Sequence, residues 1–320
     1  MTAVHRIAEP TTDLPAAGSP PARPSVVSAR AARLRARRRP AERDLTQIDS
    51  LLELSTGLWP WLPGANVIMQ LANPGVGYGV LESRVESGRV DRHPIKRGRT
   101  TGLYLAVATI GSESDRAFIH DEVKRIHSQV FSTPQSPVRY SGNSQQLQLW
   151  VAVCLLRFFV DQYELLYREL TPAEREHFLA LGRPLATVLN VSPDAWPENW
   201  QAYEEYFESG MAAAQIDPPV REMLDDLVRF GPVSGKLLGA GTALHRLVGP
   251  ANHSFTRFGV PRRTREEMHW EIRPSDLRRR RRISAVARAA DELLPAPLKT
   301  LYTVALWDLR IRRALGIAVF

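Results

Sequence analysis

The chain has 320 residues, 44% hydrophobic and 24% charged, so it can bury the core of one large domain or two small ones. The single cysteine, Cys154, excludes a disulfide framework and any metal or redox site built on paired cysteines, which fits a reducing compartment. The net charge of +8 lies largely in two arginine-rich runs, 30–39 and 278–282, and the rest of the chain is close to neutral, so we expect no nucleic-acid partner.

The first 43 residues are rich in Pro, Ala and Arg and have little apolar periodicity. Such a composition buries too little apolar surface to offset chain entropy. We therefore predict a disordered tail over residues 1–43 and one folded domain over residues 44–320. The tail shows no apolar stretch typical of a secretory signal or membrane anchor, so we expect a cytoplasmic protein with at most peripheral membrane contact.

A glycine-rich stretch, PGVGYGV, occupies residues 74–80. It lacks the glycine spacing and the flanking strand of a dinucleotide-binding motif. We predict instead a tight turn that allows close backbone approach.

The first predicted helix of functional interest covers residues 95–110. Its i, i+4, i+7 spacing places Arg97, Thr101 and Tyr104 on one face, together with a small alanine. A mainly apolar face with a few placed polar groups is typical of the wall of a ligand or cofactor cavity.

A second predicted helix, over residues 115–131, carries an apolar stripe from Ile119 to Val130, and His127 lies in that stripe. A histidine on an apolar face is more often a satisfied core residue than a ligand. However, neutral imidazole is the commonest axial ligand of haem iron, and His127 follows the Arg97 and Thr101 face by one helix. His120, two turns earlier, is expected at the surface.

Further helical signals follow along the chain. The apolar run 147–160, interrupted by Gln148 and Arg157, is shorter than the roughly 20 residues that cross a bilayer and predicts a buried core helix. The sequence TPAE at residues 171–174 predicts a capping-box start for a helix to residue 189. Because alternating strand patterns are scarce, we predict an all-α fold. Other helices are expected over residues 198–214, 219–230, 274–294 and 298–314.

Two alternative functions remain open on the residues alone. The pairs Glu174/His177 and Glu266/His269 have the ExxH spacing of a carboxylate-bridged di-iron oxidase, although Glu174 also fits a helix cap. The second alternative is a non-enzymatic helical binding protein that uses its arginine runs on nucleic acid or an anionic membrane. Cys154 lies among apolar residues without a basic partner and is expected to be an inert buried thiol.

Several segments together resemble the MpaB and rubber-oxygenase catalytic-domain family over about residues 50–310. They agree with it in order and spacing, although no single motif is long. The segments are VIMQLANPGVGYGV (67–80), RGRTTGLYLAVATIG (97–111), HSQV (127–130), YSGNSQQLQLWV (140–151) and LTPAERE (170–176).

The resemblance implies a single all-helical domain with a globin-like core that binds haem b. In it, His127 matches the proximal iron ligand, Arg97 and Thr101 match a polar pair beside the haem, and Tyr104 shares their face. It implies a haem-dependent oxidoreductase or oxygenase acting on an apolar or aromatic substrate with dioxygen or peroxide, with an electron donor as a further partner where the reaction needs one. Pocket-lining candidates are Tyr104, Leu105, Trp150 and Phe158.

This sequence departs from the latex-clearing members of the family at two places. Thr100 stands where those proteins can carry a lysine that closes the other face of the iron. The segment after Phe178, LALGRPL, lacks a glutamate often found there. Rubber cleavage is therefore not implied.

Overall fold

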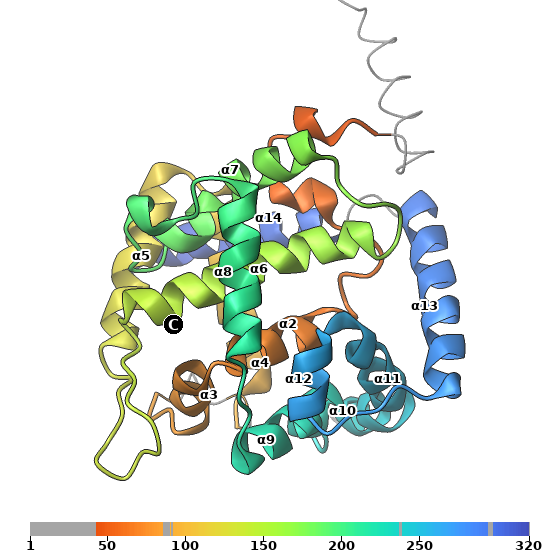
Figure 1. Ribbon diagram of the computed structural model, residues 1–320. Helices are drawn as coiled ribbons and strands as arrows, with labels where there is room; N and C mark the ends of the chain where they lie inside the picture. Colours follow the sequence, from red (N-terminus) through yellow and green to blue (C-terminus); the bar gives the residue numbers. More distant parts are fainter. Residues whose placement is uncertain (1–42, 86–89, 91, 237–238, 294–296, 320) are drawn as a thin grey trace, which may run out of the picture. The chain divides into compact units, whose positions relative to one another are not determined.

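A long buried helix, α6 (Gln145–Glu164), runs through the middle of the helical packing (Figure 1). It packs against α2 (Pro63–Leu71), α7 (Pro172–Thr187) and α8 (Trp200–Ala212). Its central residues, including the free Cys154, are buried, and burial raises the pKa of that thiol well above its ordinary value. The predicted core helix and buried cysteine are thus confirmed.

The computed structural model describes residues 43–85, 90, 92–236, 239–293 and 297–319. Across these segments the regular elements are helices, apart from one isolated antiparallel bridge between Phe131 and Ser141, so the predicted all-α fold is confirmed. Within the same segments, no helix combines the length and apolarity needed to span a membrane. The remaining elements are η2 (Leu45–Gln47), η3 (Leu51–Leu54), α3 (Pro74–Leu81), α4 (Pro94–Ile110), α5 (Glu113–His127), η5 (Pro193–Ala195), α9 (Pro218–Val228), η6 (Gly231–Val233), α10 (Ala240–Ala243), η8 (Leu244–Val248), α11 (Gly249–Gly259), α12 (Arg262–Glu267), α13 (Pro274–Leu293) and α14 (Pro297–Ala314).

The glycine-rich stretch is the helix α3, so the prediction of a tight turn is wrong. The side chain of Asn73 accepts a hydrogen bond from the Gly75 N–H, and Pro74 occupies the first helical position, both of which favour a helix start. Close backbone approach does occur, because a Cβ at Gly77 would lie 2.8 Å from the carbonyl oxygen of Leu71.

The helix α5 ends at His127, four residues before the predicted end. It starts at a capping box formed by Ser112 and Asp115. At its other end the following chain folds back, and the Gly142 N–H donates to the Val130 carbonyl at 2.6 Å. This return places Gly142 so close that a Cβ there would lie 2.7 Å from the His127 carbonyl oxygen. His127 therefore occupies a helix end enclosed by a returning loop.

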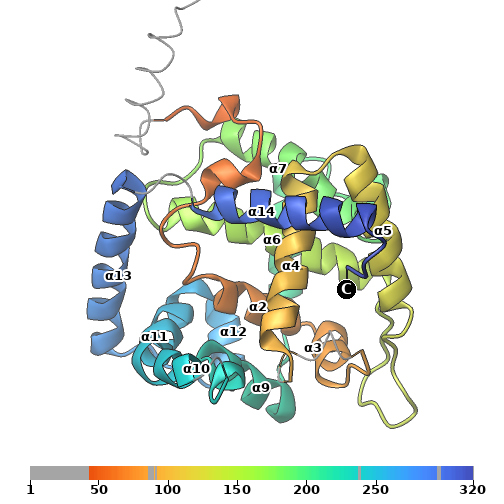
Figure 2. The same cartoon turned by 180° about the vertical axis from the view of Figure 1, so that it is seen from behind.

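The helix α4 lies between the C-terminal helix and the site described below. One side of α4 packs on α14. This is the most extensive contact between two helices in the described segments. Figure 2 shows α14 in front of α6 and crossing α4. The opposite face of α4 carries Arg97, Thr101 and Tyr104.

The predicted disordered tail lies outside the described residues up to Glu42. We expect a chain beginning at Arg43 to fold as the full chain does, because the earliest described contacts start at that residue. The Arg43 carbonyl accepts from Arg168 at 3.0 Å, and the Leu45 N–H donates to Glu174 at 3.2 Å. Thermal denaturation followed by circular dichroism should give the same midpoint for both chains. A lower midpoint for the truncated chain would show that the tail packs on the domain.

Candidate functional site

A cavity of about 220 Å³ is bounded mainly by α3, α4, α5 and α6. All four predicted site residues, Arg97, Thr101, Tyr104 and His127, line it, so the structure brings them together. Its walls are otherwise largely apolar. The aliphatic lining residues are Leu71, Val76, Val80, Val85, Val123, Ile126, Val130, Leu147, Val151, Leu155 and Leu189.

The His127 ring is held by a buried glutamine from α6. The Gln148 Nε2 lies 3.1 Å from His127 Nδ1 and donates to the Gly142 carbonyl at 2.6 Å. The Gln148 Oε1 accepts from the Asn190 N–H. Because both ends of this amide are engaged, it constrains how the imidazole is turned. In the part of the chain that the structure describes, no hydrogen bond to His127 Nε2 is formed.

Burial and the positive charge of Arg97 together lower the pKa of His127 to about 4. The imidazole is therefore neutral at physiological pH. The neutral form is the one that coordinates a metal through a ring nitrogen, so His127 has the charge required of a ligand.

Arg97 is partly buried at the cavity, and burial lowers the pKa of its guanidinium. Among the described residues it forms no hydrogen bond or ion pair through its side chain. Its neighbour Arg99, by contrast, pairs with Asp308 at 3.0 Å on the side of α14. An arginine stays charged in proteins, and a partly desolvated cation without a partner is costly unless an anion meets it. The cavity thus presents an unneutralised positive charge.

Thr101 and Tyr104 play different parts in the wall. The Thr101 hydroxyl, one turn beyond Arg97, has no hydrogen-bond partner among the described residues and is available to a ligand. The buried Tyr104 hydroxyl instead donates to the Leu185 carbonyl of α7, and burial raises its pKa. Tyr104 therefore shapes the wall and joins α4 to α7.

Three of the predicted lining residues lie elsewhere. Leu105, Trp150 and Phe158 are buried in the core and are absent from the cavity lining, so that prediction is wrong. The face of α6 toward the cavity carries positions 147, 148, 151 and 155. Trp150 points away, stacks on Phe207 at 6.0 Å between ring centroids and donates to the Gln70 carbonyl.

The sequence does not identify the role of Gln148, although it gives a signal. Gln148 is, with Arg157, one of the two polar residues that interrupt the apolar run 147–160. A buried polar side chain at such a position has to find hydrogen-bond partners, and here one of these is the candidate ligand.

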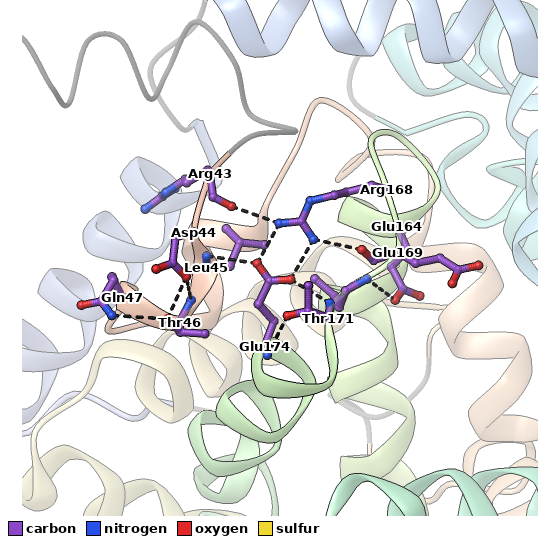
Figure 3. A network of polar contacts seen from close by, with 11 residues as sticks. Arg43, Asp44, Leu45, Thr46, Gln47, Glu164, Arg168, Glu169, Thr171 and Glu174 are labelled. Atoms are coloured by element: carbon purple, nitrogen blue, oxygen red, sulfur yellow. Dashed lines mark hydrogen bonds and ion pairs between the residues drawn. The ribbon is translucent and has the colours of Figure 1, made fainter.

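Both residues of the first ExxH pair bond to other parts of the fold, and Figure 3 shows the contacts of Glu174. The Glu174 carboxylate lies 2.7 Å from Arg168, and it accepts the Thr171 N–H at 2.8 Å, which completes the predicted capping box. His177 Nε2 lies 2.7 Å from the Ile48 carbonyl oxygen.

The second ExxH pair lies near the surface. Glu266 pairs with Arg262 at 2.8 Å, and His269 Nδ1 lies 3.1 Å from the Arg221 guanidinium. Across the described segments, no group of three or more His, Cys, Asp or Glu side chains is placed to hold a metal ion. The structure does not assemble the di-iron site considered from the sequence.

We expect Glu174→Gln and His177→Ala to leave metal content and activity unchanged. Glu174→Gln should lower the free energy of unfolding by roughly 1–3 kcal/mol, because it removes a charged hydrogen-bond acceptor from a buried site. Iron analysis and urea denaturation test both expectations. Loss of stoichiometric iron in either variant would revive the di-iron alternative.

The stability contributed by Glu174 should also depend on pH. Burial raises the pKa of Glu174, but hydrogen bonds from Arg168, Thr171 and Leu45 lower it by more. The resulting pKa is about 2, against an ordinary value of 4.5. A carboxylate whose pKa is lowered by folding stabilises the fold fully at pH values above its pKa in the unfolded chain. This stabilisation is lost as the pH falls through its pKa in the folded protein. The difference in stability between parent and Glu174→Gln should therefore shrink below about pH 4.5.

Comparison with known proteins gives one family match and two similar proteins. The family model described as "ER-bound oxygenase mpaB/B'/Rubber oxygenase, catalytic domain" matches residues 55–292, which include every residue that lines the cavity. The chain is similar to the uncharacterized proteins Rv2237 of Mycobacterium tuberculosis and Mb2261 of Mycobacterium bovis. Each is 45% identical over 258 residues, covering 80% of this chain and 98% of the relative. No solved structure matches significantly.

Proposed function

Because this chain belongs to the mpaB and rubber oxygenase catalytic-domain family, we propose that it is a haem b-dependent oxygenase acting on an apolar or aromatic substrate with dioxygen or peroxide. Family membership supports the general oxygenase class. Haem binding and the class of substrate are inferred from one observation. The residues His127, Arg97 and Thr101 line the same apolar-walled cavity.

The residues of the cavity fit a haem better than a metal ion held by side chains alone. His127 is the one histidine that lines the cavity in the described part of the chain, and a metal held by a single side chain needs its other ligands from elsewhere. A porphyrin supplies them. Its apolar ring suits the aliphatic walls, and its propionates are anions that could pair with Arg97, which has no counter-charge among the described residues.

Each polar residue then has a distinct role in the proposal. His127 would hold the iron, and Gln148 would bond the same ring at its Nδ1. Arg97 would neutralise a propionate or stabilise negative charge that develops during the reaction, while Thr101 would donate a hydrogen bond. Bound haem would supply the redox chemistry, which the side chains of the cavity do not provide.

The lining also bears on the class of substrate. Aliphatic walls with few polar groups favour an apolar substrate. Thr100, at the position of the lysine in latex-clearing proteins, lines the cavity and donates its hydroxyl to the Arg97 carbonyl at 3.0 Å. No second cation therefore enters the cavity from this position, so rubber cleavage is not carried over. The other departure, after Phe178, lies in α7, which contributes no lining residue.

An absorption spectrum of the purified protein tests the proposal. We expect a Soret band that shifts on reduction and on addition of cyanide, with haem in stoichiometric amount by pyridine haemochrome assay. Oxygen consumption with apolar substrates, in the presence of a reductant, then tests the oxygenase activity. Protein made in haem-replete cells that shows no Soret band, and gains none with added hemin, would contradict the proposal.

A further inference from the structure

The outward face of α14 carries a row of large exposed apolar side chains. Leu301, Val304, Trp307 and Ile311 are 51%, 61%, 64% and 53% exposed, and Leu315, just past the helix end, is 67% exposed. Their spacing of three and four residues places them along one side of the helix. We call these five residues the α14 stripe.

The opposite side of α14 already has a partner. Tyr302, Leu306 and Leu309 are buried, and α14 packs along α4. The helix is thus apolar on two sides, of which the described residues cover only one. Single exposed apolar residues are ordinary, but a continuous row that includes a tryptophan marks an interaction surface.

The surroundings of the α14 stripe are basic. The helix carries Lys299, Arg310, Arg312 and Arg313 against a single acidic residue, Asp308. Beside its C-terminal end lies a shallow surface hollow lined by Arg310, Arg313, Ser114 and the carboxylate of Asp115, among others.

The balance of charge in this hollow is positive. Arg310 neutralises Asp115 at 2.8 Å. Arg313 donates to the Ser114 carbonyl at 3.3 Å and lies over the Phe118 ring at 5.0 Å, and it forms no ion pair among the described residues. A partner that covers the α14 stripe therefore meets exposed positive charge at its edge.

We propose that α14 docks this protein on the surface of an anionic lipid bilayer. The α14 stripe would enter the boundary between headgroups and acyl chains, and the flanking basic residues would meet lipid phosphates. A second copy of the chain fits less well, because a twofold contact places the same surface on both partners and brings like charges together. The attachment is peripheral and does not depend on the proposed oxygenase function.

Vesicle sedimentation with the full chain tests this docking. We expect binding to phosphatidylcholine vesicles that contain phosphatidylglycerol, much weaker binding to phosphatidylcholine alone, and release by salt. Ile311→Asp should lower the partition coefficient by about tenfold or more, because it removes a large apolar group and adds a repelled charge. The matched control is Leu247→Asp, which adds the same charge at a site 78% exposed on η8 and should bind as the parent does.

A spectroscopic readout keeps the test independent of the stability of Ile311→Asp. Tryptophan emission should shift to shorter wavelength on addition of anionic vesicles, and Trp307→Phe should lose that shift while still binding. Equal binding by Ile311→Asp and parent would overturn the proposal, since other arginines would then carry the attraction. A parent that sediments as a dimer without lipid, and becomes monomeric as Ile311→Asp, would overturn it in favour of a second copy.

Discussion

Replacing His127 with alanine is expected to give a folded protein that retains little haem. Among the described residues, His127 is the one imidazole that lines the cavity, and the Tyr104 hydroxyl already donates to the Leu185 carbonyl. The fold should lose only about 1 kcal/mol, because one hydrogen bond, to Gln148, disappears. Pyridine haemochrome assay and urea denaturation of parent and variant measure the two effects separately.

His120→Ala is the matched control for this prediction. His120 lies on the same helix, is likewise partly buried and bonds the Leu189 carbonyl through Nδ1 at 3.0 Å, but it is not a lining residue. This variant should keep parental haem at a similar cost in stability. Equal haem in His127→Ala and parent would remove His127 as the ligand, and equal losses in both variants would assign the effect to helix stability.

Arg97→Ala is expected to weaken haem retention by roughly ten- to hundredfold, the equivalent of about 1.5–3 kcal/mol for a charged hydrogen bond. The reason is that Arg97 has no counter-charge among the described residues and would gain one from the cofactor. Thr101→Val keeps the side-chain shape and removes one hydroxyl, so it should retain haem and mainly slow oxygen consumption. Parental haem content and oxygen consumption in Arg97→Ala would place Arg97 outside the site.

The haem-free protein gives a second readout of Arg97. Because Arg97 contributes to lowering the pKa of His127 to about 4, Arg97→Ala should raise that pKa, while burial keeps it below the ordinary value of 6.5. Because folding lowers the pKa of His127, burial of the neutral ring stabilises the fold fully above about pH 6.5. This stabilisation is lost as the pH falls through about 4. Titration of the His127 ring by nuclear magnetic resonance measures the shift.

Arg99→Ala provides the control on the same helix. Arg99 pairs with Asp308 and donates to the Val319 carbonyl, both on the side of α14. It should leave haem content and the pKa of His127 unchanged. A response equal to that of Arg97→Ala would show that both variants act through the packing of α4.

The parts of the fold that depend on local sequence were predictable. The capping box at Thr171 and the i+4 spacing of Arg97 and Thr101 are properties of single helices, and both predictions agree with the structure. The end of α5 was not predictable, because Gly142, fifteen positions beyond His127, closes the turn. The sequence also does not predict α11, because the buried side of this helix includes the polar residues Asn252 and Thr256 and so lacks a regular apolar pattern. The Asn252 amide donates to the Val228 carbonyl, and the Thr256 hydroxyl donates to the Asn252 carbonyl.

The site shows the same division. One helical face was enough to group Arg97, Thr101 and Tyr104, and the order of the helices was enough to add His127. Which residues of α6 line the cavity depends on how that helix is rotated against its neighbours. The sequence does not determine this rotation, because α6 has apolar residues on nearly every side. Trp150 and Phe158 were therefore assigned to the wrong side, and Gln148 was not assigned at all.

The Gln148 amide also determines the tautomer of His127. With its oxygen bonded to the Asn190 N–H and one hydrogen given to the Gly142 carbonyl, the amide turns its other hydrogen to His127 Nδ1, which must accept it. The neutral ring then carries its own proton on Nε2. Coordination of an iron through Nε2 would require that proton to move to Nδ1 and the amide to turn its oxygen toward the ring, with loss of the bonds to Gly142 and Asn190. The haem-free and haem-bound proteins should therefore differ in which nitrogen of His127 is protonated and in the hydrogen bonds of the Gln148 amide.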